Sequence, residues 1–477
     1  MDLKQSRFVQ MLAYGYIVAP ILLFFVFWSK PVWAIIGGLI IIISFVQCMR
    51  EPWEEKPLKL DAKFALLIVL IAVIVHFSGI GGFAYQNSDL PYRNRIFLLL
   101  INEPWPVSIS SVMDGVSQQR GLIYYIGFWL PAALVGKLTK SVLAAFVAMS
   151  IWTGLGLFLT WYLLCRYRKQ FQIRTLIRFL LFGGLDIIGV LIMGRPDRLL
   201  SFGHIEWWSV CFQYSSFMTQ LFWVFNQAIY AWILTLMVLL EKRNNHLVFI
   251  FSCSLLSCTL PAVGILPFLI YKIICNMETL PHIGRKEMKE LFSFENVVGG
   301  GFVGILSFLY LFGNDSARVN SIDGVTLPLY WLVYLVFVVL EILVYFWLVY
   351  QKEKKMLFFV TLGTLLVCPL IRVGYSADFC MRASIPALVV LFLFVEETLQ
   401  RYKCQGQRQK YTLLLIIWIL GSTSSIQELG RGIWKTWLPV FNTNIENSIA
   451  EEAIVNGGNF SGNIEDNIYY SFFANVD

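Results

Sequence analysis

The chain has 477 residues, and its composition is far more apolar than that of a soluble protein. Hydrophobic residues make up 58% of it, charged residues only 14%, and the mean hydropathy is +0.68. Soluble domains carry about 25% charged residues, so a water-facing surface of this size is excluded. The apolar runs of about 18 to 24 residues match a hydrocarbon core of ~30 Å. The sequence therefore predicts an all-α polytopic membrane protein and excludes soluble enzymes, disordered chains and DNA-binding modules.

About 13 apolar segments are expected to cross the membrane as helices. They are apolar on every face, as in residues 64–75 (FALLIVLIAVIV), whereas strands of a membrane barrel alternate with period two. In chain order the expected spans are 10–28, 32–48, 64–84, 141–164, 176–193, 219–240, 247–259, 260–275, 297–313, 327–350, 356–374, 384–396 and 411–426.

The lysines and arginines set the expected orientation. If the apolar stretch 121–138 lies along the outer surface as an interfacial helix, 24 of the 37 basic residues fall on the other side, notably in 165–178 and 397–410. This is the positive-inside bias, and it explains the net charge of +7 without a nucleic-acid partner. We expect an integral plasma-membrane protein of bacterial type, with a cytoplasmic amino end and an extracytoplasmic carboxyl end.

Four regions follow from this layout, and no internal repeat relates them. The expected regions are 1–63 (two accessory spans and a cytoplasmic loop), 64–240 (the main transmembrane module, with outer loops 85–140 and 194–218), 241–426 (a variable transmembrane module) and 427–477 (an outer tail).

Polar residues gather at the expected outer face, first where the third span ends. The run GGFAYQNSDLPYRN (81–94) starts with glycines, which let backbones approach closely, and then delivers amides, an acid and a base. Asp89 is the expected general base, because partial desolvation makes a carboxylate a better proton acceptor. A simple ion pair with Arg93, four residues on, is the structural alternative. Candidate substrate-binding residues here are Gln86, Arg93 and Asn94.

A second polar group surrounds the outer loop 194–218. Asp186 is an acid in an apolar segment, and is either catalytic or part of a buried hydrogen bond. His204 and Glu206 are further catalytic candidates that would converge only on an extended loop. They lack the HExxH spacing of a helical zinc site, so no metal is assigned. Substrate contacts are expected from Trp207, Gln213 and Tyr214, although an interfacial tryptophan also fits an aromatic belt.

A third group lies in IRVGYSADFCMRAS (371–384). Arg372 and Arg382 are candidates for a phosphate clamp, because guanidinium binds phosphate oxygens bidentately. Asp378 is a candidate substrate contact, and its alternative role is a salt bridge to Arg382. Arg195 is a weaker candidate for holding the phosphate.

These strings and their layout resemble the GT-C superfamily of membrane glycosyltransferases, in particular uncharacterised bacterial polysaccharide-associated members. A span ends in Asp89, which opens a long outer loop with surface helices before the next span, and the strings HIEWW, QYSS and MRASIP add to the likeness. The resemblance covers about 64–240 well and 356–390 moderately. It identifies 64–240 as the catalytic module.

The resemblance implies an inverting glycosyltransferase that takes a sugar from a polyprenyl-phosphate donor to a cell-surface glycan or other acceptor. Asp89 would be the base, and Arg372 or Arg382 would hold the donor phosphate. Asp186 or Glu206 would supply a second acid, because no DE or DD pair stands in the first loop. The implied partners are the lipid-linked sugar, a glycan or lipid acceptor and membrane lipids, with association with other envelope-glycan enzymes left open. A divalent metal cofactor is disfavoured.

Two other functions remain as alternatives. A polysaccharide polymerase or ligase acting on lipid-linked oligosaccharides would also be polytopic, but it usually has its largest outer loop late in the chain, and here that loop comes early. A lipid or polysaccharide transporter would carry its polar residues at mid-membrane and often show repeats.

Overall fold

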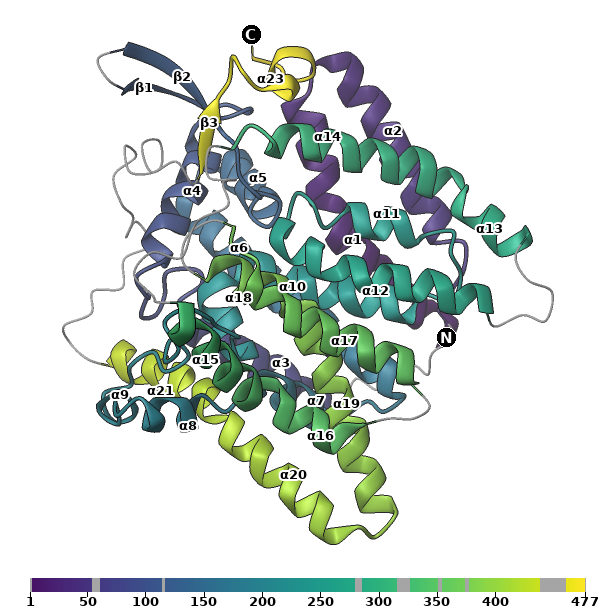
Figure 1. Cartoon of the computed structure of the whole chain (residues 1–477). Helices are drawn as coiled ribbons and strands as arrows, with labels where there is room; N and C mark the ends of the chain where they lie inside the picture. Colours follow the sequence, from purple (N-terminus) through teal and green to yellow (C-terminus); the bar gives the residue numbers. More distant parts are fainter. Residues whose placement is uncertain are drawn as a thin grey trace.

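The computed structural model describes residues 2–53, 61–113, 116–278, 285–314, 327–350, 354–373, 377–437 and 460–476. Most of these residues are helical, and the strands among them form one small sheet (Figure 1). The central helix is α10 (Phe217–Leu240), whose side chains are nearly all buried. It packs against helices from every part of the chain, namely α6, α12, α19 and α21.

Seven helices among the described residues are long and apolar enough to cross a membrane, by length and composition. They are α1 (Asp2–Trp28), α2 (Pro31–Cys48), α6 (Val142–Arg168), α10, α12 (Thr259–Glu278), the run α15 (Leu327–Val338), η2 (Val339–Leu343) and α16 (Val344–Val349), and the pair α20 (Arg408–Gly421) and α21 (Thr423–Trp437).

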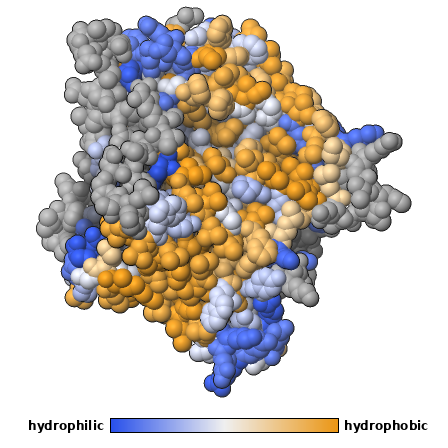
Figure 2. Space-filling model, in the orientation of Figure 1, coloured by the Kyte–Doolittle hydropathy of each residue, from blue (hydrophilic) through white to orange (hydrophobic). Residues whose placement is uncertain are grey.

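The outward faces of these helices are apolar. On α2, for example, Val32, Ile35 and Leu39 are all more than half exposed, and Figure 2 shows a broad hydrophobic surface over this face of the molecule. Such a surface suits lipid and not water. The expectation of a mostly helical chain with several membrane-spanning helices is thus confirmed at that level.

The other expected spans are short or interrupted helices, except that the one over 384–396 lies in a 20-residue helix with charged residues in its second half, so the count of 13 is not confirmed. They correspond to α3 (Ala62–Phe77), α7 (Ile173–Leu180), α8 (Asp186–Ile192), α11 (Leu247–Ser252), η1 (Glu295–Gly300), α14 (Gly301–Leu311), α17 (Lys355–Val367), η4 (Cys368–Leu370) and α19 (Ile385–Cys404). The span expected over 176–193 is broken between α7 and α8. A Cβ at Gly184 in this break would lie 1.4 Å from Glu341 Oε2, so the backbone passes directly against that carboxylate.

The long loop after α3 is more elaborate than the sequence indicated. It contains α4 (Leu90–Asn102), the hairpin of β1 (Ser108–Met113) and β2 (Val116–Leu122), and α5 (Leu130–Thr139). The surface helix expected over 121–138 is wrong in its first part. β2 continues to Leu122, and the helix begins only at Leu130, where Pro131 occupies the first turn, the position at which proline costs no hydrogen bond.

The sheet is completed by a segment from the far end of the chain. β3 (Ser461–Asn463) pairs antiparallel with β2, and α23 (Ile468–Phe472) follows it (Figure 1, top). The tail expected from residue 427 begins inside α21, and its residues 438–459 lie outside the described residues. The remaining helices are α9 (Asp197–Leu200), α13 (Arg285–Leu291) and α18 (Asp378–Ala383).

Segments that the basic-residue count places on one side of the membrane meet in the structure. Arg243 forms ion pairs with Glu51 and Glu290, which joins three expected inner loops. At the other side, Ser29 bridges to Ala474, so the turn after α1 meets the tail. Each of these contacts joins segments that the charge pattern assigns to the same side of the membrane.

One close helix contact can be tested by a single methyl group. Gly264 on α12 faces α18, where its Cβ would lie 1.9 Å from the carbonyl oxygen of Ala383. We expect Gly264→Ala to lower the free energy of unfolding by roughly 1–3 kcal/mol, because α18 must move away. The measurement is the thermal unfolding midpoint of the purified protein in detergent.

The matched control is Gly363→Ala on α17, where nothing lies within 4 Å of the new Cβ. That variant should keep or slightly raise the midpoint, since alanine favours a helix over glycine by about 1 kcal/mol. Equal midpoints for the two variants would contradict the close approach of α12 and α18.

Candidate active site

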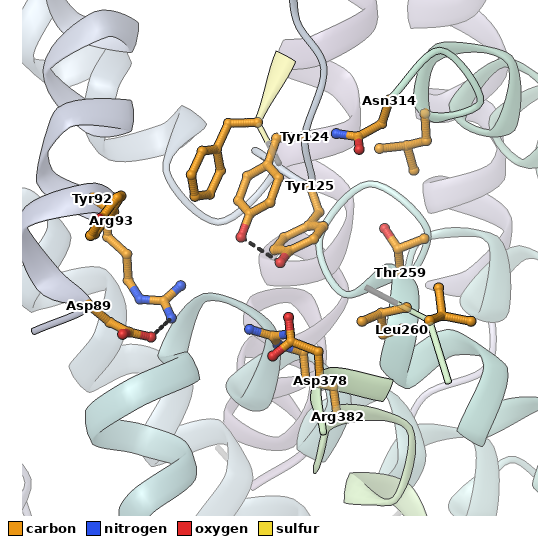
Figure 3. A pocket seen from close by; sticks show the side chains of 13 residues that line it. Asp89, Tyr92, Arg93, Tyr124, Tyr125, Thr259, Leu260, Asn314, Asp378 and Arg382 are labelled. Carbon is orange, nitrogen blue, oxygen red and sulfur yellow. Dashed lines mark hydrogen bonds and ion pairs between the residues drawn. The ribbon is translucent and has the colours of Figure 1, made fainter. Parts of the chain in front are cut away.

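A cavity of about 410 Å³ opens where several loops meet (Figure 3). Its walls come from segments that the charge pattern places on the outer side of the membrane, although they lie far apart in the chain. The lining residues are Asp89, Tyr92, Arg93, Tyr124, Tyr125, Thr259, Leu260, Leu311, Asn314, Val373, Asp378, Arg382 and Phe460. Four residues singled out in the sequence, two acids and two arginines, are therefore in one site.

The turn before α4 places Asp89 at this cavity. Gly79, Gly81 and Gly82 all adopt positive φ, which only glycine does without strain. Asn87 then holds the turn, because its Oδ1 accepts from the backbone N–H of Asp89 at 3.0 Å. Its amide Nδ2 donates to the carbonyl of Phe222 at 2.8 Å, beside the non-helical residue Val224 that kinks α10. The turn is thus fastened to the central helix.

The Asp89 carboxylate points into the cavity and stays partly solvated. Its side chain is 45% exposed and makes no helix-capping hydrogen bond, although it stands at the N-terminus of α4. Arg93 donates to Oδ2 of Asp89 at 3.1 Å and to Oδ1 of Asn226 at 3.0 Å. The ion pair expected as the structural alternative therefore exists, and it forms one wall of the cavity.

A second ion pair forms another wall. Arg382 Nη1 lies 2.6 Å from Oδ2 of Asp378, both on α18, and the arginine is buried while the aspartate side chain is 34% exposed. The Nε atoms of Arg382 and Arg93 are buried and have no hydrogen-bond partner among the described residues. Both guanidinium groups thus keep donors that the described protein atoms leave unsatisfied.

Two tyrosines lie between these ion pairs. The hydroxyl of Tyr124 donates to that of Tyr125, and the ring centroids are 3.6 Å apart. Burial and the neighbouring Tyr125 raise the pKa of Tyr124, so its hydroxyl stays protonated at neutral pH. Phe460, the residue before β3, packs edge-on against Tyr124 with centroids 5.0 Å apart. The cavity therefore has an aromatic side facing its charged groups (Figure 3).

The acids of the second sequence cluster lie elsewhere, in a buried polar network. Asp186, at the start of α8, accepts from the hydroxyl of Ser424 on α21 at 2.6 Å. Glu206 accepts from the hydroxyl of Thr219 at 2.6 Å and from the backbone N–H of Ser216 at 2.9 Å, and so fixes the start of α10. Neither acid lines the cavity that contains Asp89.

His204 continues this network toward the turn before α4. Its Nδ1 lies 3.0 Å from Oε1 of Glu428, and its Nε2 is 3.2 Å from the amide of Gln213. Glu428 also pairs with Arg431 on the same helix, α21. Glu428 and Arg431 line a small space together with Asn87. The network therefore lies directly behind the turn that places Asp89.

The network makes stability depend on pH. Burial and the charge of Asp186 raise the pKa of Glu206 from 4.5 to about 7. Burial lowers the pKa of His204, but its hydrogen bond to Glu428 and the charge of Glu206 outweigh this and raise it above 6.5. A group whose pKa is higher in the folded than in the unfolded state stabilises the fold fully below its unfolded-state pKa. That stabilisation is lost as the pH rises through its folded-state pKa. The contribution of Glu206 to the free energy of unfolding should therefore fall between about pH 4.5 and 7, and the contribution of His204 should fall above pH 6.5.

We expect the thermal midpoint in detergent to be several degrees higher near pH 5 than near pH 8. Glu206→Gln keeps an acceptor for Thr219 and cannot ionise, so its midpoint should change less over this range. Equal pH slopes for the wild type and Glu206→Gln would show that Glu206 is ionised throughout.

The other expected site residues have structural contacts. Gln86 accepts from Nδ2 of Asn94 at 3.0 Å, which braces the turn from behind. Arg372 lies over the ring of Phe212, 5.4 Å from its centroid, and does not line the cavity. Tyr214 is buried and donates to the carbonyl of Leu365.

Two expected residues lie at the surface. Arg195 pairs with the exposed Asp197 at 3.2 Å. Trp207 is 47% exposed, whereas its neighbour Trp208 is buried and donates to Glu341 at 3.1 Å.

Sequence reasoning missed the tyrosine pair, Asn314 and Phe460. Tyr124 and Tyr125 lie in the stretch 121–138 that is expected to form a surface helix, where aromatic side chains do not indicate a site. Phe460 belongs to the tail, and nothing local indicates that it returns to the first loop. Glu341 in the buried network had a usable signal, because an acid within an apolar helix is costly and usually functional or paired. Glu428 stands in a polar helix and had no such signal.

Among the residues that the structure describes, no group of three or more His, Cys, Asp or Glu side chains is arranged to hold a metal ion. Comparison with known proteins matches no family model, no curated protein and no solved structure to this chain.

Proposed function

We propose that this protein is a membrane glycosyltransferase of the GT-C type, which transfers a sugar from a polyprenyl-phosphate donor to a glycan or other acceptor at the extracytoplasmic face. The observation that carries the proposal is the cavity with Asp89 and Arg382 in its lining. A partly solvated carboxylate and a buried guanidinium in one cavity are the two groups that such a transfer needs, one for the proton and one for the phosphate.

Arg93 and Arg382 in the cavity lining suit the phosphate of the donor. Arg382 lines the cavity and shares one terminal nitrogen with Asp378, so a phosphate oxygen in the cavity can approach the same guanidinium. Arg93 faces the cavity as a second cation. The apolar lining residues Leu260, Leu311 and Val373 suit the first part of a lipid tail.

The transfer itself needs one base. Asp89 accepts the proton of the acceptor hydroxyl while the hydroxyl oxygen attacks the anomeric carbon. The bond between that carbon and the phosphate oxygen breaks, and the lipid phosphate leaves with the bonding electrons. Arg382 stabilises the negative charge that develops on the phosphate. The attack from the face opposite the leaving group inverts the anomeric configuration.

Tyr124 and Tyr125 would orient the sugar. Their rings give an apolar face and their hydroxyls give hydrogen-bonding groups, the combination that suits a sugar ring. The buried network of Asp186, Glu206 and His204 supports the turn from behind and takes no part in the chemical step.

The direct test is sugar transfer by the purified protein in nanodiscs supplied with synthetic polyprenyl-phosphate sugars. Release of polyprenyl phosphate together with a glycosylated acceptor is the expected result. If no lipid-linked monosaccharide turns over and a lipid-linked oligosaccharide binds instead, the polymerase or ligase becomes the better assignment.

A further inference from the structure

A second large cavity, of about 490 Å³, lies at the opposite end of the helices from the candidate active site. Its walls are the end of α6, the start of α7, the end of α19 and the start of α20. We call it the basic pocket, and its lining residues are Arg168, Gln170, Gln172, Arg174, Arg178, Glu396, Leu399, Gln400, Lys403, Cys404 and Tyr411.

The length of α19 sets the distance between the two cavities. Arg382 of the first cavity precedes this helix by three residues, and Lys403 of the basic pocket lies in its last turn. A 20-residue helix is about 30 Å long, the thickness of a hydrocarbon core. The two cavities therefore lie toward opposite ends of α19.

The basic pocket carries an excess of positive charge. Four cationic side chains line it, and Glu396 is its one acid. The carboxylate of Glu396 is fully buried and is already shared by Arg168, at 2.9 Å, and Arg178, at 3.2 Å. The adjacent acid Glu397 pairs with Lys354 at 2.6 Å. No further carboxylate in the lining compensates the exposed cations Arg174 and Lys403.

The surroundings of these cations are those of a membrane surface. Leu399 and Tyr411 form part of the lining, and α20 continues from the pocket with the exposed apolar residues Leu413, Ile416 and Ile419. Figure 2 shows hydrophilic atoms at the end of the α19–α20 hairpin, next to the hydrophobic surface of α20. A molecule with an anionic head and apolar chains matches both parts.

We propose that the basic pocket binds the phosphate headgroup of an anionic membrane phospholipid whose acyl chains lie along α20. Guanidinium groups recognise phosphate bidentately, and basic pockets between membrane helices hold anionic headgroups by this chemistry. The site is separate from the candidate active site, and it does not depend on what that site transfers.

The test is retention of phosphatidylglycerol, compared with phosphatidylcholine, by the full-length protein in native mass spectrometry. The test variant is Arg174→Gln with Lys403→Gln, which removes two exposed cations of the pocket and leaves the Glu396 pairs intact. We expect it to bind phosphatidylglycerol roughly ten- to thirtyfold more weakly than wild type. The matched control is Arg408→Gln with Lys410→Gln, which removes two exposed cations on the same hairpin outside the lining.

The control should retain phosphatidylglycerol as the wild type does, with thermal midpoints showing that both variants are folded. Equal weakening in both double variants would overturn the proposal in favour of a diffuse attraction between the basic surface and anionic lipid. Unchanged retention in the test variant would overturn it outright. If inorganic phosphate protects the wild type against heat but not the test variant, while both retain the lipid equally, the occupant is a soluble phosphate compound and not a lipid.

Discussion

The Asp89→Asn variant is expected to lose sugar transfer by roughly 10²- to 10⁴-fold while keeping its fold, since a general base contributes about this much. Asparagine has nearly the same shape, and its amide oxygen can still accept from Arg93, which donates to Asp89 at 3.1 Å in the wild type. It cannot take up the proton of the acceptor hydroxyl. The measurement is release of polyprenyl phosphate in nanodiscs, with donor binding measured separately.

The control for this variant is Asp197→Asn. Asp197 is 63% exposed, pairs with Arg195 and lies outside the cavity, so it makes the same change of charge at a segment expected on the same membrane face. It should keep full activity. Equal turnover by Asp89→Asn and wild type would retain the enzyme and discard Asp89 as its base.

Replacement of Arg382 by glutamine is expected to reduce kcat/KM for the lipid-linked donor by about 100-fold, because a phosphate loses a charge-assisted bidentate partner. Arg382→Lys keeps the positive charge but loses the planar pair of N–H donors, so its activity should lie between those of the wild type and Arg382→Gln. Because Arg382 acts on the departing phosphate, part of the loss should persist at saturating donor as a fall in kcat.

Loss of Arg382 also leaves Asp378 without its ion-pair partner, and this could reduce activity by disturbing α18. The double variant Asp378→Asn with Arg382→Gln removes that unpaired charge. If it stays as inactive as Arg382→Gln, the arginine acts on the donor. Recovery of activity in the double variant would show that the arginine serves only to neutralise Asp378.

The sequence predicted those parts of the fold that depend on the lipid environment. Long apolar runs such as α2 and α6 are expected because only a helix satisfies its backbone hydrogen bonds within a bilayer. The lysine and arginine positions placed the segments of Glu51, Arg243 and Glu290 on one side, and these residues form ion pairs in the structure. The sequence could not show which of the shorter apolar segments form a complete span. In α11, for example, six residues are too few for a pattern that distinguishes a broken span from a turn.

The candidate site was predicted in part, and the limit is one of distance along the chain. Asp89 and Arg93, like Asp378 and Arg382, are four residues apart on a helix, so each pair is readable locally. That the two pairs share a cavity depends on how α4 and α18 pack, which no local pattern shows. The buried acids were expected at the same site, but their hydrogen bonds to Ser424 and Thr219 hold them behind it.

The pairing of β2 with β3 has a consequence for the order in which the molecule is made. Arg120 and Ser461, which hydrogen bond across these strands, are 341 residues apart. A chain synthesised from its amino end therefore contains Tyr124 and Tyr125 long before Phe460 leaves the ribosome. The aromatic side of the cavity is finished only after nearly every helix has been inserted. A partly made chain has Asp89, Arg93 and Arg382 but an incomplete cavity, and the full lining is present only in the late stages of translation.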